Sequence, residues 1–390
     1  MKTLCILVGL SVSIPVLLTP NQVPEVRALP SEWEKIIHSD SAEYDYRAGT
    51  IGLADDSVWV LVGAQPKGSL GQQQGYLLWH LDKNGKTILQ TDLDPARREL
   101  SSGASYRVFG MSPLGKGKLA VFAYSSKTGT SLIVLNDSTG QVLRETELEP
   151  GRNLVITKVL RTSGGGVVLV GVSGGVGSIR SLGESGEALW VRQMAAEHVA
   201  SIVDASPTGD GGLVVLGEVG GTKAGPISWI GRFQAKGELV AETHFAGDAQ
   251  SIAGSPDGSV IVVGERPAPN GKEIWARSLT ASLKERSIST VLSETKSVLP
   301  FKLAPAPGGG AVVIGANKEY LPWIGHLGQD GRLGWADTRR YDAKLVPVAG
   351  TSDVFAVSDG FVAAIGLAIL DEKGAQRQTV RVLKYKGSAK

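Results

Sequence analysis

The chain has 390 residues, of which 42% are hydrophobic and 20% are charged, so it can bury a large core and whole-chain disorder is excluded. Forty basic and 38 acidic residues leave a net charge of +2, without the basic excess of a general nucleic-acid-binding protein. Glycine is frequent, at 51 residues against about 7% in average proteins. Because there is no G-X-Y period, collagen is excluded. The high glycine content instead indicates many tight turns between short strands.

Residues 1–28 are typical of a secretory signal peptide. Lys2 supplies the positive start, residues 4–18 are mostly apolar, and Val26-Arg27-Ala28 offers a cleavage site. An uncleaved membrane anchor is the alternative, but the run is shorter than the ~20 apolar residues of a span and contains Pro15. We therefore expect a periplasmic or secreted protein with no stable membrane span once the signal is removed.

The single cysteine, Cys5, lies inside this segment. Removal of the segment leaves a mature chain without a thiol. Structural disulfides, cysteine nucleophiles and thiolate metal sites are therefore all excluded from the mature protein.

The rest of the chain repeats one pattern seven times. Its clearest part is a β-branched run that ends in most copies with glycine, at 57–63, 118–123, 166–171, 212–217, 259–264, 310–315 and 360–366. The last five closing glycines are separated by 46, 47, 51 and 51 residues. A tight turn follows each third element at Asn84-Gly85, Thr139-Gly140, Ser185-Gly186, Lys236-Gly237, Asp330-Gly331 and Lys373-Gly374, and only the fifth copy lacks the glycine.

These repeats predict the fold. Apolar runs of five or six residues rich in Val and Ile suit buried strands, and Asn-Gly or Asp-Gly pairs supply the positive φ of a two-residue hairpin turn. A single blade cannot bury both faces of its sheet, whereas radial stacking does. We predict an all-β fold, a seven-bladed β-propeller of four-stranded antiparallel blades over residues 49–390. A two-sheet sandwich is the rival, and strict recurrence favours radial closure.

The flanking segments have separate predictions. Residues 29–48 form an N-terminal extension with a short helix, since Ser31 can act as its N-cap and Glu34 follows three residues later. A final strand at Thr379–Tyr385 is expected to complete the last blade.

The turns LDKNGKTILQ, LNDSTGQVLRE, LGESGEALW and LGQDGRLGW resemble the repeat of secreted bacterial β-propellers. That group includes quinoprotein-like repeats of the pyrroloquinoline-quinone type and the propeller scaffold of the outer-membrane β-barrel assembly machine. The resemblance implies architecture and not activity. The chain departs from it in four ways. The repeat spacing is longer than in the quinone type, there is no vicinal cysteine pair, no group of residues fits the cofactor's metal, and the lipoprotein cysteine of the assembly scaffold is missing.

Catalytic and metal motifs are weak. Gly171-Val172-Ser173-Gly174-Gly175 matches the nucleophile-elbow pattern, but it ends a predicted strand and no helix follows. The five histidines form no zinc motif, so we predict no catalytic residue, no metal and no cofactor. His80, His326 and Arg232 share one repeat position, which we expect to face solvent. Trp229, Trp275 and Trp323 share another, with Leu77 in the first copy, and core packing is favoured there over sugar stacking.

Loop lengths point to one end of the propeller. Loops between the second and third strands are long at 65–74, 220–226, 266–272 and 317–322, whereas the turns between the third and fourth strands are minimal. We call the two ends the long-loop face and the short-turn face. Binding residues tend to lie on variable loops held by a rigid scaffold. Five of the second-to-third loops contain a lysine, namely Lys67, Lys127, Lys223, Lys272 and Lys318, and a ring of lysines would attract an acidic partner.

The leading hypothesis is a non-catalytic, monomeric, exported propeller that binds another protein as a scaffold or inhibitor in the bacterial envelope. One alternative is an enzyme acting on a polysaccharide or another envelope polymer, which requires two carboxylates from different blades within roughly 5–10 Å. Another alternative is a small-molecule or quinone-binding propeller.

Overall fold

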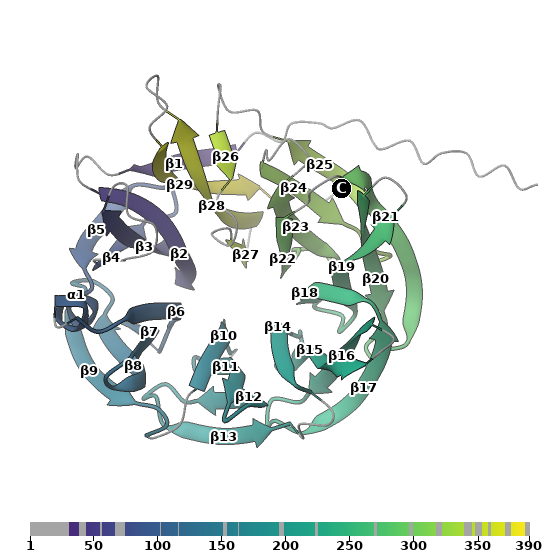
Figure 1. Cartoon of the computed structure of the whole chain (residues 1–390), viewed down its shortest axis with the longest axis horizontal. Coiled ribbons are helices and arrows are strands. Elements are labelled where there is room, and N and C mark those ends of the chain that lie inside the picture. Colours follow the sequence, from purple (N-terminus) through teal and green to yellow (C-terminus); the bar gives the residue numbers. More distant parts are fainter. Residues whose placement is uncertain are drawn as a thin grey trace, which may run out of the picture.

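A computed structural model shows seven antiparallel sheets arranged as the blades of a ring (Figure 1). The described residues are 31–38, 44–54, 57–66, 75–101, 103–115, 117–150, 154–162, 164–194, 199–222, 225–268, 271–295, 299–316, 322–338, 345–347, 353–357, 360–370 and 376–386. The all-β, seven-bladed architecture predicted from the repeats is confirmed, whereas the predicted signal peptide lies outside the described residues.

The first three blades are meanders of four strands. Blade 1 contains β2 (Tyr44–Ala54), β3 (Ser57–Pro66), β4 (Gly75–Leu81) and β5 (Thr87–Asp92). Blade 2 contains β6 (Tyr106–Pro113), β7 (Lys118–Ser125), β8 (Gly129–Asn136) and β9 (Val142–Glu147). Blade 3 contains β10 (Leu154–Arg161), β11 (Val167–Ser173), β12 (Val176–Leu182) and β13 (Ala188–Gln193). A helix, α1 (Asp94–Ser101), connects blades 1 and 2.

The next three blades repeat this plan. Blade 4 contains β14 (Ser201–Pro207), β15 (Leu213–Thr222), β16 (Gly225–Phe233) and β17 (Leu239–Ala246). Blade 5 contains β18 (Asp248–Gly254), β19 (Val260–Ala268), β20 (Gly271–Leu279) and β21 (Glu285–Thr295). Blade 6 contains β22 (Leu299–Pro305), β23 (Ala311–Ala316), β24 (Pro322–Leu327) and β25 (Leu333–Thr338).

Blade 7 joins the two ends of the described chain. Its strands are β26 (Leu345–Pro347), β27 (Asp353–Val357), β28 (Gly360–Leu370), β29 (Gln376–Lys386) and β1 (Ser31–His38). Both β26 and β27 pair with β28, and β1 pairs with β29 as the outermost strand. The first strand of the chain therefore closes the ring against the last one.

The helix predicted over the N-terminal extension is wrong, because residues 31–38 form β1. Burial alternates along this strand: Trp33 and Ile37 face inward while Glu34 is exposed, which is the two-residue period of a strand. The unpaired edge of β29 supplies hydrogen bonds to the whole segment, and these outweigh a local N-cap at Ser31. The strand predicted at Thr379–Tyr385 exists within β29, but it is the third strand of its blade and not the last.

Glycine turns set the described hairpins as predicted, while the predicted turn at Lys373-Gly374 lies outside the described residues. The turn glycines after the third strands have positive φ, between 70° and 79°, at Gly85, Gly140, Gly186, Gly237 and Gly331. In the fifth repeat the equivalent residue is Leu283, with a φ of 59°. Leu283 is the one positive-φ residue other than glycine among the residues the structure describes.

The core consists of one apolar cluster at each interface between neighbouring blades. The clusters follow the ring from blades 1 and 2 round to blades 7 and 1. The apolar runs contribute to both sides: Val215 faces blade 3 while Val214 faces blade 5. Because both faces of these strands are buried, the runs are hydrophobic at every position and not only at alternate ones.

The repeated tryptophans lie in this core, so the packing prediction is confirmed. Trp229, Trp275 and Trp323 are between 1% and 4% exposed. Trp229 is paired across the hairpin with a closing glycine, Gly217, and Trp275 with Gly264 in the same way. A Cβ atom on Gly264 would lie 2.3 Å from Trp275 Cζ2, so the glycine leaves the space that the indole occupies.

Candidate functional site

Seven equivalent positions on the innermost strands form a belt around the central axis, which we call the inner belt. Each residue pairs with the fifth residue of the apolar run in the second strand of its blade. The residues are Thr50, Gly110, Lys158, Asp204, Ser251, Lys302 and Asp353. From blade 3 to blade 7 the belt therefore reads cation, acid, hydroxyl, cation, acid.

Asp204 is the centre of the belt and is fully buried. Its Oδ1 accepts hydrogen bonds from Lys158 Nζ at 2.6 Å and from the Ala205 N–H at 2.9 Å. Its Oδ2 accepts hydrogen bonds from the Ser251 hydroxyl and from the Ile252 N–H, the latter at 3.1 Å. Each carboxylate oxygen thus has two donors, and Asp204 has no access to a substrate.

The network continues across the neighbouring blade. Ser251 Oγ accepts a hydrogen bond from the Leu303 N–H at 3.0 Å, so Lys158, Asp204, Ser251 and Leu303 link the innermost strands of blades 3, 4, 5 and 6. Buried polar groups that are fully hydrogen-bonded fix a unique arrangement of the elements around them. This part of the belt is a structural element of the ring.

The two belt carboxylates have opposite shifts in pKa. Burial acts to raise the pKa of Asp204, but the ammonium groups of Lys158 and Lys302 outweigh it, and the pKa lies below its usual value. Burial raises the pKa of Asp353 above its ordinary value, although the same two lysines act to lower it. Asp204 is therefore a fixed anion near neutral pH, and Asp353 is the more readily protonated of the two.

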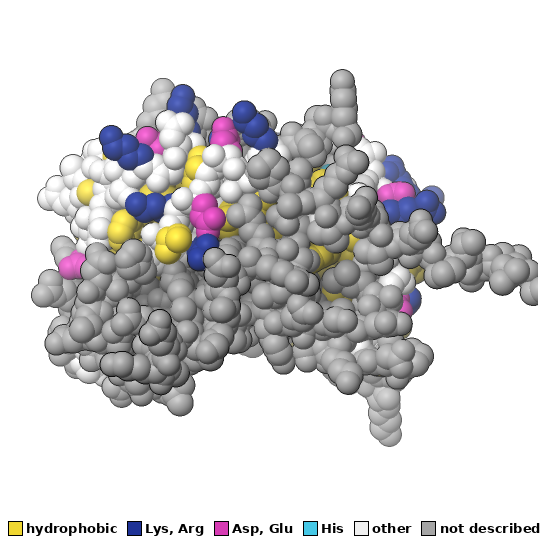
Figure 2. All heavy atoms as spheres, turned by 90° about the horizontal axis from the view of Figure 1, so that it is seen from above, with side chains coloured by type: hydrophobic (Ala, Val, Ile, Leu, Met, Phe, Trp, Pro, Cys, Tyr) yellow, Lys and Arg dark blue, Asp and Glu magenta, His cyan; other side chains and the backbone are white. Residues whose placement is uncertain are grey.

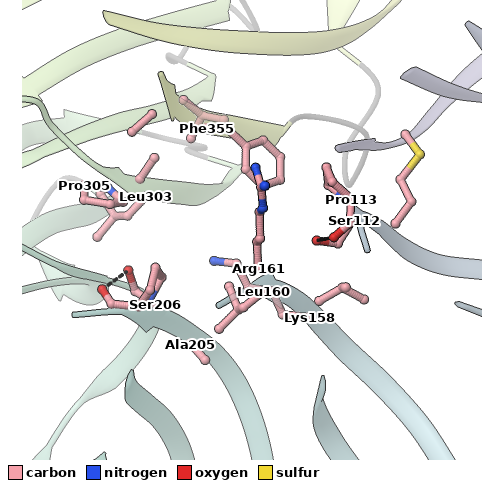
Figure 3. Close-up of a pocket in the computed structure, with 16 residues that line it drawn as sticks. Ser112, Pro113, Lys158, Leu160, Arg161, Ala205, Ser206, Leu303, Pro305 and Phe355 are labelled. Atoms are coloured by element: carbon pink, nitrogen blue, oxygen red, sulfur yellow. Dashed lines mark hydrogen bonds between the residues drawn. The ribbon is translucent and has the colours of Figure 1, made fainter. Parts of the chain in front are cut away.

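A pocket of about 390 Å³ is lined by residues at and after the inner belt on the innermost strands, which run toward the short-turn face. Figure 3 shows its lining side chains. Five innermost strands line it, namely β6, β10, β14, β22 and β27. Its wall is mostly apolar and includes Met111, Leu160 and Phe355, while Lys158 and Arg161 supply positive charge. No Asp or Glu occurs among the sixteen described residues that line it.

A second pocket, of about 440 Å³, lies between blades 2 and 3 at the long-loop end of the innermost strands. It is lined by Ser105, Tyr106, Arg107, Phe109, Tyr124, Leu154 and Val155, and we call it the aromatic pocket. The Arg107 guanidinium lies 5.5 Å from the centroid of the Phe109 ring, and the Val155 side chain is 48% exposed. Aromatic and arginine side chains around a concave surface are typical of residues that anchor a protein partner.

The five candidate lysines are only partly placed. Lys67, Lys223 and Lys318 lie outside the described residues. Lys127 is exposed on the turn between β7 and β8, and its N–H donates to Ser125 Oγ at 3.1 Å. Because Ser105 of the aromatic pocket is hydrogen-bonded to the neighbouring Ser126, Lys127 lies beside that pocket.

Lys272 is part of a mixed-charge cluster in blade 5. Its Nζ lies 2.5 Å from Glu265 Oε2, and Glu265 is itself buried. Asp248 is the cross-strand partner of Glu265, and burial together with the Glu265 charge raises the pKa of Asp248. The positive charge of Lys272 is therefore offset locally, and Lys127 is the described lysine that best fits the predicted ring.

The long-loop face is more regular than its sequence suggests. The segments 220–226 and 266–272 were predicted as loops, but Thr222 pairs with Gly225 and Ala268 pairs with Gly271. These hairpins extend the second and third strands of blades 4 and 5. The loop prediction was wrong because glycine and proline, which are typical of loops, occur in these segments. Pairing between the two strands of each hairpin nevertheless continues through them.

The position shared by His80, His326 and Arg232 does not face solvent as predicted. All three side chains are half-buried, and Arg232 donates hydrogen bonds to the carbonyl oxygens of Gly258 and Ala281 in the next blade, at 3.1 and 2.6 Å. Arg232 therefore links blades 4 and 5, whereas His80 contacts Ser57 Oγ at 2.8 Å within its own blade. Burial lowers the pKa of both histidines.

The nucleophile-like motif ends a strand and no helix follows it, as expected. Ser173 ends β11, its hydroxyl donates to Glu149, and Gly174 and Gly175 form the hairpin turn with positive φ. Within the described part of the chain there is no group of three or more His, Cys, Asp or Glu side chains that could hold a metal ion. No helix in those same ranges is long and apolar enough to cross a membrane.

Seen edge-on, the described surface carries basic and acidic side chains side by side with small apolar areas (Figure 2). On the outer strand of blade 7, for example, Arg381 pairs with Glu34 at 2.6 Å and Lys384 pairs with Glu32 at 3.1 Å. On this edge, therefore, the charges of basic and acidic side chains offset one another locally.

No protein-family model and no curated protein matches the chain. A solved protein of unknown function from Dyadobacter fermentans is similar in structure, with a TM-score of 0.50, 10% identity, and coverage of 93% of this chain and 100% of that one. The WD40 domain of Toxoplasma gondii coronin has a TM-score of 0.49 and 12% identity, with coverage of 94% and 90%. A Bacteroides caccae protein of unknown function has a TM-score of 0.42 and 15% identity, with coverage of 64% and 89%. At these identities the similarity concerns the fold alone.

Proposed function

We propose that this protein is a non-catalytic, exported β-propeller that binds a protein partner through its long-loop face, as a scaffold or inhibitor in the bacterial envelope. The observation that supports this most is the aromatic pocket. Tyr106, Tyr124 and Arg107 are residue types that dominate binding energy at protein interfaces, and they surround a concavity on a rigid frame.

Charge beside the pocket favours an acidic segment of the partner. Arg107 and Lys127 are exposed and lie on the same blade as Tyr124. Cationic groups next to an apolar anchor steer an acidic partner to the site and set its orientation. The five-lysine ring extends this reasoning around the face and remains a prediction.

The inner belt weakens the enzyme alternative. An acid–base pair across the central axis would need two accessible carboxylates from different blades. Asp204 is buried with all four acceptor positions used, which leaves Asp353 without an accessible partner in the belt.

Affinity capture from an envelope fraction tests the proposal. The bait is the mature chain, compared with Val155→Glu, with a variant in which all five loop lysines are changed to Glu, and with a control, Lys236→Glu. Lys236 is exposed in the turn between β16 and β17 on the opposite face. We expect one protein to be enriched by the native chain and by Lys236→Glu, and to be lost at least tenfold with Val155→Glu. Identical capture by every bait would contradict binding through this face.

The lysine variant tests the ring separately from the pocket. Loss of capture with Val155→Glu but not with the lysine variant would support binding at the aromatic pocket and would contradict a role for the lysine ring.

One observation favours the enzyme alternative, namely the raised pKa of Asp248 beside Glu265 at the long-loop end of blade 5. A carboxyl group with a raised pKa beside a second carboxyl group is one feature of glycoside hydrolases, although both groups here belong to blade 5. Release of reducing ends from envelope polysaccharide by the native chain, absent in Asp248→Asn, would support this alternative over the binding function.

A further inference from the structure

The aromatic pocket also indicates what a protein partner inserts into it, an inference that rests on the proposed function. Phe109 lies at a β-bulge, because the pairing of β6 with β7 passes directly from Val108 to Gly110. A bulge re-aims the side chain of its extra residue. Phe109 is half-buried and packs partly against the apolar cluster between blades 2 and 3. Its ring therefore forms part of the wall of the pocket.

Arg107 presents a guanidinium at the same wall. It pairs with Tyr124 across β6 and β7, which places both side chains on one side of the sheet. The guanidinium lies 5.5 Å from the centroid of the Phe109 ring. Arg107 is exposed, and it forms no ion pair with an acidic side chain of the described residues. A guanidinium beside an aromatic ring still offers its N–H groups, which match the two oxygens of a carboxylate.

The rest of the wall favours an aromatic side chain as the anchor. Three aromatic residues line the pocket, Tyr106, Phe109 and Tyr124, together with Leu154 and the exposed Val155. Contacts between aromatic rings stabilise a complex by more than the buried area alone. The volume of about 440 Å³ is within the ~300–1,000 Å³ of concave ligand sites. The pocket therefore has room for one large side chain.

The height of the hairpins around the pocket favours an extended chain. The hairpin of blade 3 turns at Ser173, two residues beyond Gly171, and that of blade 2 turns equally early. The hairpin of blade 4 continues to Thr222, five residues beyond Gly217. At ~3.4 Å per residue, this difference leaves the long-loop face roughly 10 Å lower at blades 2 and 3. An extended segment can reach the pocket across this low side, whereas a flat folded surface would first meet the taller hairpin.

We propose that the aromatic pocket binds a short extended segment of the protein partner. A large aromatic side chain of the segment fills the pocket between Phe109 and Tyr124. An acidic side chain next to that aromatic residue pairs with Arg107. The segment crosses the low side of the long-loop face over blades 2 and 3.

Fluorescence anisotropy with labelled five-residue peptides tests the proposal on the full mature chain. The probe has a central phenylalanine with two glutamates on either side and blocked ends. One comparison peptide has alanine at the centre, and another has glutamine in place of every glutamate. We expect the probe to bind at least tenfold more tightly than the alanine peptide, because a buried phenylalanine contributes that factor. We expect it to bind about fivefold more tightly than the glutamine peptide, as for a partly exposed ion pair. No binding of the probe at millimolar concentration, or equal affinity for the probe and either comparison peptide, would overturn the proposal.

Variants locate the peptide. Arg107→Met keeps the apolar stem, so we expect about a fivefold loss of affinity for the probe and no change for the glutamine peptide. Arg332→Met on the short-turn face, where the side chain is 81% exposed, is the matched control and should change neither. Val155→Glu, once circular dichroism shows it folded, should abolish binding of both peptides. Affinity for the probe that does not respond to Arg107→Met, or to a folded Val155→Glu, would overturn the assignment.

Competition separates this inference from the proposed function. An excess of the probe should release a captured envelope protein from the native chain. A captured protein that is lost with Val155→Glu but is not released by the probe would leave protein binding intact and show that a folded surface, not an extended segment, occupies the pocket. Absence of both capture and peptide binding would contradict both proposals. A dimer of the native chain in sedimentation, dissociated by Val155→Glu, would identify a second copy as the occupant and overturn the extended segment.

Discussion

The size of the residue in a hairpin turn and the size of the side chain that covers it from the preceding blade vary together, and this leads to a quantitative prediction. In blades 1 and 4 the turn glycine packs under a tryptophan from the outer strand of the preceding blade: Trp33 covers Gly85 and Trp190 covers Gly237, and a Cβ atom on either glycine would lie 2.7 Å from the indole. In blade 5 the large residue is in the turn and the small residue is on the outer strand of the preceding blade. Leu283 occupies the turn, and Ala241 of β17 packs beside it in the same cluster.

Leu283 therefore combines an unfavourable backbone with a favourable side chain. Its φ of 59° costs about 1–2 kcal/mol for a residue with a Cβ atom. Its side chain is 3% exposed, and deleting a buried leucine side chain costs about 2–5 kcal/mol. Burial outweighs strain, so we expect Leu283→Gly to destabilise the protein by about 1–3 kcal/mol.

A double-mutant cycle isolates this compensation. Ala241→Trp alone should be destabilising by about 1–3 kcal/mol, because the indole would collide with the leucine. Combined with Leu283→Gly, it recreates the arrangement of Trp190 and Gly237. We expect the pair to recover about 2 kcal/mol relative to the sum of the single variants, within the range seen for residues in contact.

The assay is guanidinium denaturation followed by tryptophan fluorescence and by far-ultraviolet circular dichroism, with coincident transitions required before free energies are compared. The mirror variant Gly237→Leu, made with Trp190 in place, is the control and should be strongly destabilising. Additive effects of the two substitutions in blade 5, or a Leu283→Gly variant more stable than the native chain, would refute the reasoning.

Three further predictions concern the ring and its pH dependence. Asp204→Asn should cost about 3–5 kcal/mol, since it leaves Lys158 buried without its anion, and a loss below 1 kcal/mol on denaturation would contradict a structural belt. Gly264→Ala should lower the melting temperature far more than Gly75→Ala, because a Cβ atom would lie 2.1 Å from a carbonyl oxygen at the first site and meets nothing within 4 Å at the second. The Thr208 hydroxyl and then Arg232 hold the pKa of Asp210 at about 2, below 3.8. The stability that this gives is present above pH 4 and is lost as pH falls toward 2, so Asp210→Asn should flatten that part of a pH–stability curve.

Local signals in the sequence were sufficient for the blades. The Val-rich runs and the turn glycines are patterns of neighbouring residues, and they predicted the number of blades and the hairpin turns. The paired positions of Trp229 and Gly217 also lie within one hairpin, so core packing could be predicted for that tryptophan. Each of these depends on contacts inside one repeat.

Closure of the ring could not be predicted in the same way. Residues 31–37 predicted a helix because Ser31 and Glu34 form a local N-cap pattern. The strand that pairs with this segment lies at the other end of the sequence, so local patterns do not include it. The partner that decides the outcome is β29, which pairs Glu34 with Leu383. An N-terminal strand that completes the last blade ties the two ends of the described chain together, so opening the ring requires the loss of a full set of strand hydrogen bonds and of the buried Ile37.

The inner belt was missed for a related reason, and its chemistry follows from the same geometry. Lys158, Asp204 and Ser251 are separated by 46 and 47 residues, so no motif contains them, yet the repeat places them at one level of the ring. The signal that could have found them is the repeat alignment itself, read at the innermost strand for positions that carry polar residues among apolar ones. In this propeller the faces of each sheet pack against the neighbouring blades, whereas the side chains at the central axis differ from blade to blade.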